Sequence, residues 1–508
     1  MLTTPLIFFF LVVSLRTPFV RSDCEALECV KISPSEFIGS VRTVSDVLQN
    51  VTNILKNSKF TNVNNGLEDA LLQSAIVACL ELIDLSTKEL NWSISAIENP
   101  RGTHNNTENM SSDLKTWLSA ILANTDTCME GFEGTNGRIV KGLISNAIDQ
   151  VNSLVQKLLT QVHHVSEQFA SKGQFPSWFK AEDQMLLETN KVLGDVIVAI
   201  DGTGNYTKIM DAVKAAPNNN MKRFVIYIKK GVYNEYVNID SNKLNLVMIG
   251  EGMDATIITG NRSYANKFVT TKSATFGVSG KGFIARDISF KNSAGPKGYQ
   301  AVALLSDSDT SVFYRCGIFG YQDSLYARTM RQFYRECKIS GTVDFIFGQA
   351  AVVFQKCQIL AKKGLPKQQN TIAAQGATTP TQLSAFSFQF CNISADYDLL
   401  PLVRTTSTYL GRPWKAYSRT VFMQSYISDI VRPEGWLEWE GSKYLDTLYY
   451  AEYKNNGPGA RLDKRVKWRG YHVINDSIQA SNFTVAKLIN GNLWLPSTNV
   501  TFTPGLGN

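Results

Sequence analysis

A five-residue pattern ending in Cys-x-Ile recurs in the second half of the chain and restricts its fold more than any other feature. It occupies Tyr314–Ile318, Arg335–Ile339, Gln355–Ile359 and Gln389–Ile393, with an earlier variant at Ala285–Ile288. The first two steps between the isoleucines are 21 and 20 residues, whereas the third is 34 and therefore carries an insertion. Strand-like segments that repeat at about 20 residues predict a parallel β-helix, in which each coil stacks on the last. A β-sandwich is the alternative, but it does not explain repeated sequence at matching offsets.

The cysteines of this repeat are expected to stack inside the β-helix, and two interpretations of them stay open. They could pack as small apolar residues, or Cys337 and Cys357 could form a disulfide between adjacent coils. The chain has 8 cysteines, an even number that permits disulfides in an oxidising compartment. Cys79 and Cys128 fall in separate predicted helices and could be bridged, and Cys24 with Cys29 could close a short loop.

The first third of the chain has a different periodicity. Between Leu67 and Leu90 the apolar residues recur at spacings of three and four, and similar patterns follow to Leu159. An antiparallel helical bundle is the simplest architecture for such a pattern. We therefore expect four regions, which are a signal peptide (1–22), a helical domain (23–165), a linker (166–194) and the β-helix (195–508).

Several features predict export from the cell. Leu6–Leu15 is apolar but too short to span a bilayer, as in a signal peptide, with Val20 and Ser22 placed for cleavage. No later segment is expected to reach transmembrane length. Asn-x-Ser/Thr sequons are frequent, as in a glycoprotein, and begin at Asn50, Asn91, Asn105, Asn109, Asn205, Asn261, Asn392, Asn475, Asn482 and Asn499.

Charge and histidine content narrow the chemistry. The net charge is +7, which suits an acidic partner, but no dense Lys/Arg cluster indicates nucleic acid. The chain has 4 histidines, three of them in the helical region, and no Gly-x-Ser-x-Gly motif, so a Ser-His-Asp hydrolase and a histidine-ligated metal are both disfavoured. Carboxylate chemistry remains.

Two aspartates share the coil spacing. Asp323 and Asp344 are 21 residues apart, which equals a step of the repeat and places their backbones about 4.8 Å apart on neighbouring coils. Carboxyl groups that close cannot both ionise easily, so one is expected to be anionic and the other protonated. Gln300 precedes Gln322 by 22 residues, and an amide there could stabilise an oxyanion. Arg412 could hold one aspartate anionic, although its spacing does not say which.

With these motifs in order, the second part of the chain resembles the pectin methylesterase family of plants. The resemblance rests on Asp201–Tyr206, Gly231–Glu235, Gln300–Leu304, Gly320–Tyr326, Asp344–Gly348 and Leu410–Trp414. It implies a right-handed parallel β-helix that acts on methylesterified homogalacturonan in the cell wall, with no metal or organic cofactor. Ser324 replaces the usual threonine of the family.

The resemblance also implies the role of each site residue. Asp344 would attack the methyl ester, Gln322 with Gln300 would stabilise the oxyanion, and Asp323 would protonate methanol and then activate water. Arg412 would bind Asp344, and Thr270 would contact substrate. The expected aromatic lining of the sugar groove is Tyr326, Phe347, Tyr409, Trp414 and Trp439.

The helical region resembles the pectin methylesterase inhibitor domain through Trp117–Ala120 and Asp126–Phe132. By this resemblance it would cover the groove as an intramolecular inhibitor until it is removed. The connector reads Asp183–Leu187 where the family usually carries a basic processing motif. No nucleic-acid or membrane partner is expected.

Two other classes of function stay open on the sequence. A catalytically silent pectin-binding or inhibitory protein would bind the polymer without releasing methanol. A β-helix lyase or glycosidase would shorten the polymer, whereas an esterase would at first leave its length unchanged.

Overall fold

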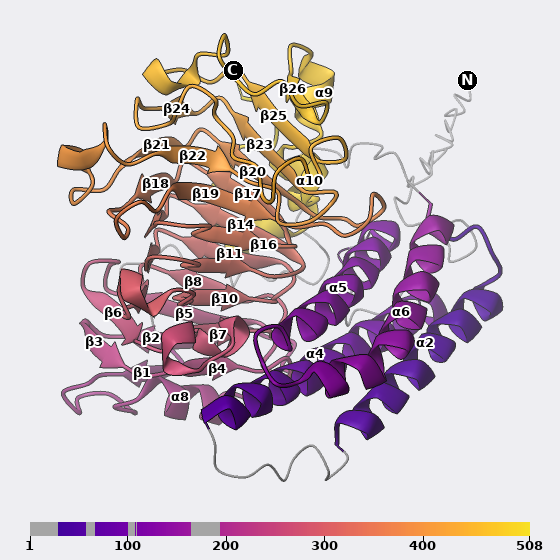
Figure 1. The fold of residues 1–508 in the computed structure, drawn as a ribbon. Helices are drawn as coiled ribbons and strands as arrows, with labels where there is room; N and C mark the ends of the chain where they lie inside the picture. The colour runs from indigo at the N-terminus through magenta and orange to yellow at the C-terminus, as the bar shows by residue number, and fades with distance from the viewer. Residues whose placement is uncertain (1–28, 57–66, 100–106, 108, 164–193, 508) are drawn as a thin grey trace, which may run out of the picture.

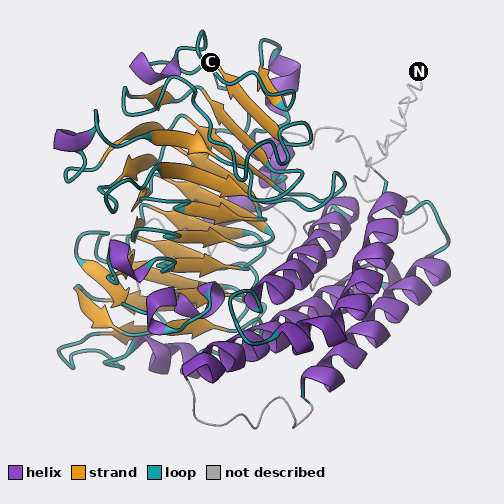
Figure 2. Ribbon diagram, in the orientation of Figure 1, coloured by secondary structure: helices purple, strands orange, loops and turns teal. Residues whose placement is uncertain are grey.

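The computed structural model describes residues 29–56, 67–99, 107, 109–163 and 194–507, which form a helical bundle packed against one side of a long stack of strands (Figure 1). The predicted signal peptide, Cys24, Asn105 and almost all of the predicted linker lie outside the described residues. Figure 2 shows how the two parts differ, since the N-terminal part is helical and the rest consists mainly of short strands, with loops and a few short helices between them.

The bundle consists of four long helices within the described residues, which are α2 (Pro34–Leu55), α4 (Leu67–Glu98), α5 (Met110–Gly131) and α6 (Arg138–Gln161). Helix α2 begins with Pro34 after the capping residue Ser33, whose hydroxyl accepts the Glu36 N–H. Its buried residues recur at spacings of three and four from Phe37 to Leu55, as in an amphipathic helix. The predicted Cys79–Cys128 disulfide is confirmed and joins α4 to α5.

Helix α5 differs from α2 and α6 because 16 of its 22 residues are buried and none is exposed on any face. One face packs on α4 and α6, and the opposite face packs on the strands (Figure 1). Residues Ala70–Glu98 of α4 are long and apolar enough to cross a membrane, so the expectation that no later segment reaches that length was wrong. Because α4 packs on α2 and α5, its apolar character is explained by the bundle core.

The strands form three parallel sheets, which confirms the predicted parallel β-helix. Sheet 1 contains β1 (Val196–Val198), β2 (Phe224–Ile228), β5 (Leu246–Gly250), β8 (Ile284–Arg286), β11 (Ser311–Tyr314), β14 (Arg331–Arg335), β17 (Ala351–Gln355), β20 (Ala385–Gln389), β23 (Arg419–Met423), β25 (Tyr449–Tyr453) and β26 (Tyr471–Val473). Sheet 2 contains β4 (Val237–Ile239), β7 (Phe276–Val278), β10 (Leu304–Ser306), β13 (Leu325–Ala327), β16 (Ile346–Gly348), β19 (Asn370–Gln375) and β22 (Thr408–Gly411). Sheet 3 contains β3 (Gly231–Asn234), β6 (Thr256–Gly260), β9 (Ser289–Asn292), β12 (Gly317–Phe319), β15 (Lys338–Gly341), β18 (Gln358–Ala361), β21 (Asn392–Ala395) and β24 (Tyr426–Ile427).

The Cys-x-Ile repeat marks the corner between sheets 1 and 3. The residue before each cysteine has a left-handed backbone, as in Arg315 (φ 51°), Glu336 (φ 54°) and Lys356 (φ 55°), and this turns the chain from one sheet into the next. The following isoleucines pair in register, for example Ile318 with Ile339. The repeat is therefore a corner motif of the coil.

The cysteines after this corner point into the core, and the possible Cys337–Cys357 disulfide is not formed. The Cys337 thiol instead donates to the Phe313 carbonyl at 3.2 Å, and that of Cys357 donates to the Tyr334 carbonyl at 3.5 Å. Because each thiol already has a partner in the coil below, stacking alone explains the column.

The ends and the outer face of the β-helix are covered by short helices. Helix α8 (Ile209–Ala215) packs its apolar side on the first coils. Near the C-terminus, α10 (Val485–Leu488) and α11 (Gly491–Trp494) pack on the outer side of sheet 1, after α9 (Ser477–Ser481). Sheet 2 is left to face the helical bundle, so anything bound on sheet 2 lies under α4 and α5.

Candidate active site

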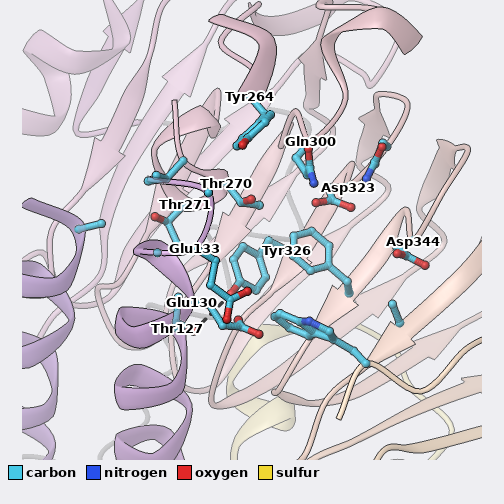
Figure 3. A pocket seen from close by; sticks show the side chains of 18 of the residues that line it. Thr127, Glu130, Glu133, Tyr264, Thr270, Thr271, Gln300, Asp323, Tyr326 and Asp344 are labelled. Carbon is cyan, nitrogen blue, oxygen red and sulfur yellow. Dashed lines mark hydrogen bonds between the residues drawn. The ribbon is translucent and has the colours of Figure 1, made fainter. Parts of the chain in front are cut away.

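A cavity of about 510 Å³ lies between sheet 2 and the helical bundle. The floor comes from the β-helix, and Figure 3 shows Thr127, Glu130 and Glu133 reaching into the cavity from α5 and the turn that follows it. The floor residues include Thr270, Gln300, Gln322, Asp323, Tyr326, Asp344, Phe347, Arg412, Trp414 and Trp439. The structure therefore brings together nearly all of the site residues predicted from the sequence.

Asp323 and Asp344 occupy the same position in successive coils, as their spacing predicts. Leu325 pairs with Ile346 in sheet 2, and each aspartate stands two residues before one of these partners. Both aspartates have a left-handed backbone, with φ of 64° and 50°, at the corner that leads into sheet 2. The strained corner places both side chains in the cavity.

The Asp344 carboxylate is held by three hydrogen bonds. Arg412 donates from Nε to Oδ1 at 2.8 Å and from Nη2 to Oδ2 at 2.6 Å. The Thr371 hydroxyl donates to Oδ1 at 2.6 Å and accepts the backbone N–H of Asp344 at 2.8 Å. A two-pronged guanidinium contact and a third donor stabilise the ionised form and fix its orientation. Asp344 is therefore the anionic member of the pair.

Asp323 has the opposite environment. Its side chain is buried, and within the described part of the chain no hydrogen bond reaches its carboxyl group. Burial raises the pKa of Asp323 well above its usual value, the negative charge of Asp344 raises it further, and Arg412 opposes both. Asp323 therefore keeps its proton to a higher pH than an ordinary aspartate does, and it lies beside an anion that can attack a carbonyl.

The amides and rings around the pair complete the cavity floor. Gln300 and Gln322 both reach the cavity, where an amide N–H can stabilise a developing oxyanion. Tyr326 and Phe347 stack with ring centroids 4.1 Å apart, and the edge of Trp414 meets both rings. A floor of aromatic faces suits the C–H surface of a sugar.

Two further aromatic predictions had different outcomes. Trp439 lies under the Arg412 guanidinium, with 4.3 Å between the guanidinium carbon and the ring centroid, so it supports the arginine that holds Asp344. Tyr409 is not among the residues that line the cavity, because it lies in β22 paired with Thr371. Tyr409 therefore lies two coils beyond Asp344, because β22 follows β19 and β19 follows β16.

Sequence reasoning missed Thr371. Ile346 pairs with Ala373, and Asp344 and Thr371 each stand two residues before these partners. Thr371 therefore occupies the same position in its coil as Asp344 does in the preceding coil. The step from Asp344 to Thr371 is 27 residues instead of 21, because a loop intervenes before β19. Aligning strand ends instead of counting residues would have found it.

Comparison with known proteins agrees with this geometry. The family described as Pectinesterase matches residues 195–492, and that described as Plant invertase/pectin methylesterase inhibitor matches residues 37–163.

A pectinesterase/pectinesterase inhibitor of Prunus persica is 60% identical over 481 residues, which is 94% of this chain and 91% of that protein. A probable pectinesterase/pectinesterase inhibitor of Arabidopsis thaliana is 55% identical over 94% of each chain. The solved pectin methylesterase from carrot has a TM-score of 0.62 and 48% identity, and the match covers 63% of this chain and 100% of that one. The Aspergillus niger pectin methylesterase has a TM-score of 0.53 and 30% identity, over 61% and 97%.

Proposed function

This chain belongs to the pectinesterase family, and we propose that it hydrolyses the C6 methyl esters of homogalacturonan through an acyl-enzyme on Asp344. The activity is that of a carboxylic ester hydrolase, which releases methanol and leaves a free carboxylate on the polymer. The observation that carries the assignment of roles is the asymmetry of the two aspartates. Asp344 is held ionised by Arg412 and Thr371, whereas Asp323 is buried without such donors.

The reaction proceeds in two steps. One oxygen of the Asp344 carboxylate attacks the ester carbonyl, and the amides of Gln300 and Gln322 stabilise the oxyanion. Asp323 gives its proton to the departing methoxide, so methanol leaves and an anhydride joins Asp344 to the substrate. Asp323, now ionised, takes a proton from water as that water attacks the anhydride. Asp344 and Asp323 return to their starting states, and the sugar carboxylic acid that forms loses its proton to solvent and becomes the carboxylate.

The competing functions fit the cavity less well. A silent pectin-binding protein has no need of a carboxylate held by Arg412 next to a protonated acid. The family match covers the whole strand-rich part of the chain, which favours the enzyme over that alternative. An esterase would also release methanol before the polymer becomes shorter, in contrast to a lyase or a glycosidase.

The helical domain is proposed to inhibit the enzyme from within the chain. Arg331, the first residue of β14, forms ion pairs with Asp113 of α5 at 2.8 Å and with Asp309 at 2.6 Å. All three side chains are fully buried, and the Trp117 indole N–H also donates to Asp309 at 3.3 Å. Polar groups buried this completely must stay paired, which holds α5 over sheet 2 and closes the cavity to a polymer.

The enzyme is proposed to act outside the cell, in the cell wall. The supporting features are the predicted signal peptide, the Cys79–Cys128 disulfide and the sequons, which suit an oxidising secretory route. Several of the sequon asparagines are exposed and accessible to a glycan, namely Asn50, Asn91, Asn205, Asn261, Asn392, Asn475 and Asn482.

Methanol release by the β-helix alone tests the proposed function. Residues 194–508 have their own hydrophobic core, and 63% of this chain covers the solved pectin methylesterase from carrot over its full length, so we expect the fragment to fold by itself. It should release methanol from methylesterified homogalacturonan while the polymer keeps its length in size-exclusion chromatography. A folded fragment that binds the polymer without releasing methanol would contradict the proposal.

Thr371 offers a test of how the nucleophile is positioned. Thr371→Val in the fragment keeps the shape of the side chain but removes a hydrogen bond to a charged group, so kcat should fall about 10- to 100-fold with little change in KM. Thr371→Ser keeps the hydroxyl and should retain most of the activity. Equal kcat in the valine and serine variants would show that the hydroxyl does not act on Asp344.

Closure of the helical domain should depend on pH through Glu130. Burial raises the pKa of Glu130 from 4.5 to about 7, with the charge of Asp126 acting in the same direction and Lys415 opposing it. A pKa that rises on closing means that closing takes up a proton, so the closed state is favoured at low pH and loses stability as pH rises through about 7. Glu89 belongs to α4 and is buried beside Arg328; burial raises its pKa as well, with Arg328 opposing, so it acts with the same sign.

This dependence is measured as the activity of the full chain divided by that of the fragment at each pH, because the ratio cancels the pH dependence of catalysis itself. The ratio should increase between pH 5 and pH 8, and Glu130→Gln should reduce the increase. A ratio that is constant or falls with pH would rule out this linkage.

A further inference from the structure

Beside Trp414, which lines the cavity, two polar side chains of the β-helix lie next to each other. Lys415 lies between β22 and β23, and Gln349 lies between β16 and β17. Gly376 stands among them, since a Cβ there would be 3.0 Å from both Lys415 Cγ and Trp414 Cε3 and 3.4 Å from Gln349 Cγ. The glycine leaves room for these side chains to converge on the same face as Asp344.

Both side chains bind a carboxylate in the closed chain. The Lys415 ammonium forms ion pairs with Asp126 Oδ2 at 3.0 Å and with Glu130, both on α5. The Gln349 Nε2 donates to the same Asp126 oxygen at 2.7 Å. The orientation of this amide is fixed from below, because its Oε1 accepts a hydrogen bond from Gln382 Nε2 at 2.9 Å, and both glutamines are buried. The pair is a built carboxylate site with its donors already aligned.

Lys415 differs from Arg412 and Arg331 in which domain supplies its carboxylate partners. Arg412 is neutralised by Asp344 of the β-helix, and Arg331, which also pairs with Asp113 of α5, keeps Asp309 of the β-helix as a partner. Within the described residues, the ion pairs of Lys415 come from α5 alone. When α5 leaves the groove, the ammonium and the Gln349 amide therefore remain as an unmatched binding site for an anion.

We propose that Lys415 and Gln349 form a subsite for the free C6 carboxylate of an already de-esterified galacturonate unit, on the same polymer chain as the ester being hydrolysed. Asp126 and Glu130 occupy this subsite in the closed chain and stand in for that carboxylate. Because Trp414 lines the catalytic cavity and Lys415 follows it directly, the carboxylate belongs to a sugar near the reacting one. A methyl ester carries no charge and cannot replace it, so the site favours polymer that has already been partly converted. This inference rests on the proposed function and adds a preference among its substrates.

The test compares two polymers and two variants of the 194–508 fragment. Lys415→Gln should raise KM about fivefold on homogalacturonan that is half de-esterified, since a charge-assisted hydrogen bond is lost, and should leave KM on fully methylesterified polymer and kcat on both unchanged. Lys338→Gln is the matched control, because Lys338 is a half-buried lysine beside an aromatic ring, Phe319, but lies on sheet 3 away from the cavity. Lys415→Gln should also weaken inhibition by unesterified hexagalacturonate by a similar factor.

Other outcomes contradict the proposal in distinct ways. An equal rise in KM on both polymers would mean that Lys415 contacts the sugar chain whatever its ester content. An unchanged KM on both would mean that Lys415 serves only to bind α5. Absence of methanol release by the unmodified fragment would instead overturn the proposed function itself.

Discussion

Asp344→Asn in the 194–508 fragment is expected to lower methanol release about 10⁴-fold or more, since removal of a nucleophile leaves only binding and oxyanion stabilisation. The substitution keeps the size of the side chain but removes the negative charge. Arg412 and Thr371 would still find an oxygen acceptor in the amide, so the fold should survive. The measurement is initial rates of methanol release, with the thermal unfolding midpoint as the check on folding.

Asp323→Asn is the informative comparison. It should also lower kcat, because methoxide must then leave without a proton, but Asp344 can still attack. With a substrate whose leaving alcohol is more acidic than methanol, the Asp323 variant should recover activity while the Asp344 variant does not. A folded Asp344→Asn fragment with more than a tenth of the parent activity would disprove the nucleophile assignment, and equal recovery of both variants would remove the distinction between the two roles.

The stacking of Asp323 on Asp344 could be predicted from the sequence, because residues one repeat apart lie on neighbouring coils of a β-helix. Asp323 and Asp344 differ by one step of the corner motif, and the strand register confirms that they are neighbours. Their roles could not be predicted from spacing, since these depend on which one Arg412 reaches. Arg412 is 68 residues beyond Asp344, across loops of irregular length, and its placement depends on the register of β19 and β22.

At two other positions the repeat length of the β-helix was not enough to predict the structure. Thr371 belongs to the aspartate column, but the loop before β19 lengthens the step, so a count of residues passes over it. The cysteine column was predicted from the same period, whereas the bonding state of Cys337 and Cys357 depends on whether each thiol has another partner. The carbonyls of the coil below supply one, and the thiols stay unpaired with each other.

The contacts between the two domains were the hardest feature to predict from the sequence. Lys415 and Glu130 are separated by 285 residues, and neither side chain belongs to a periodic pattern that indicates a partner. The uniform burial of α5 is the local signal that could have been used. A helix buried on every face needs a second surface in addition to its own bundle, and here the β-helix supplies it through Tyr326 of sheet 2, Arg331 and Leu383.

Glu130→Lys in the full chain is expected to activate the enzyme by opening the helical domain. In the closed state the substitution would place two ammonium groups in a partly buried contact and would remove one of the carboxylates that Lys415 binds. Breaking a buried ion pair costs about 3–5 kcal/mol, and the low end of that range, which suits a partly exposed pair, would raise the ratio of open to closed chain roughly 150-fold. Methanol release by the full chain should therefore rise toward that of the 194–508 fragment.

The matched control is Asp149→Lys, which makes the same change of charge at an exposed position of α6. That helix lies on the far side of the bundle from the strands, so this variant should behave like the parent chain (Figure 1). If closure inhibits, the Glu130 variant of the full chain should gain activity toward the fixed level of the fragment, which lacks α5. Proteolysis of this variant between residues 163 and 194 should then increase its activity little further. If the full chain is already as active as the fragment, or if both charge variants activate it equally, the contacts of α5 with sheet 2 do not control the site. The outcome thus separates inhibition by a specific carboxylate contact from a general effect of charge, and only the specific contact links inhibition to the carboxylate subsite proposed for the substrate.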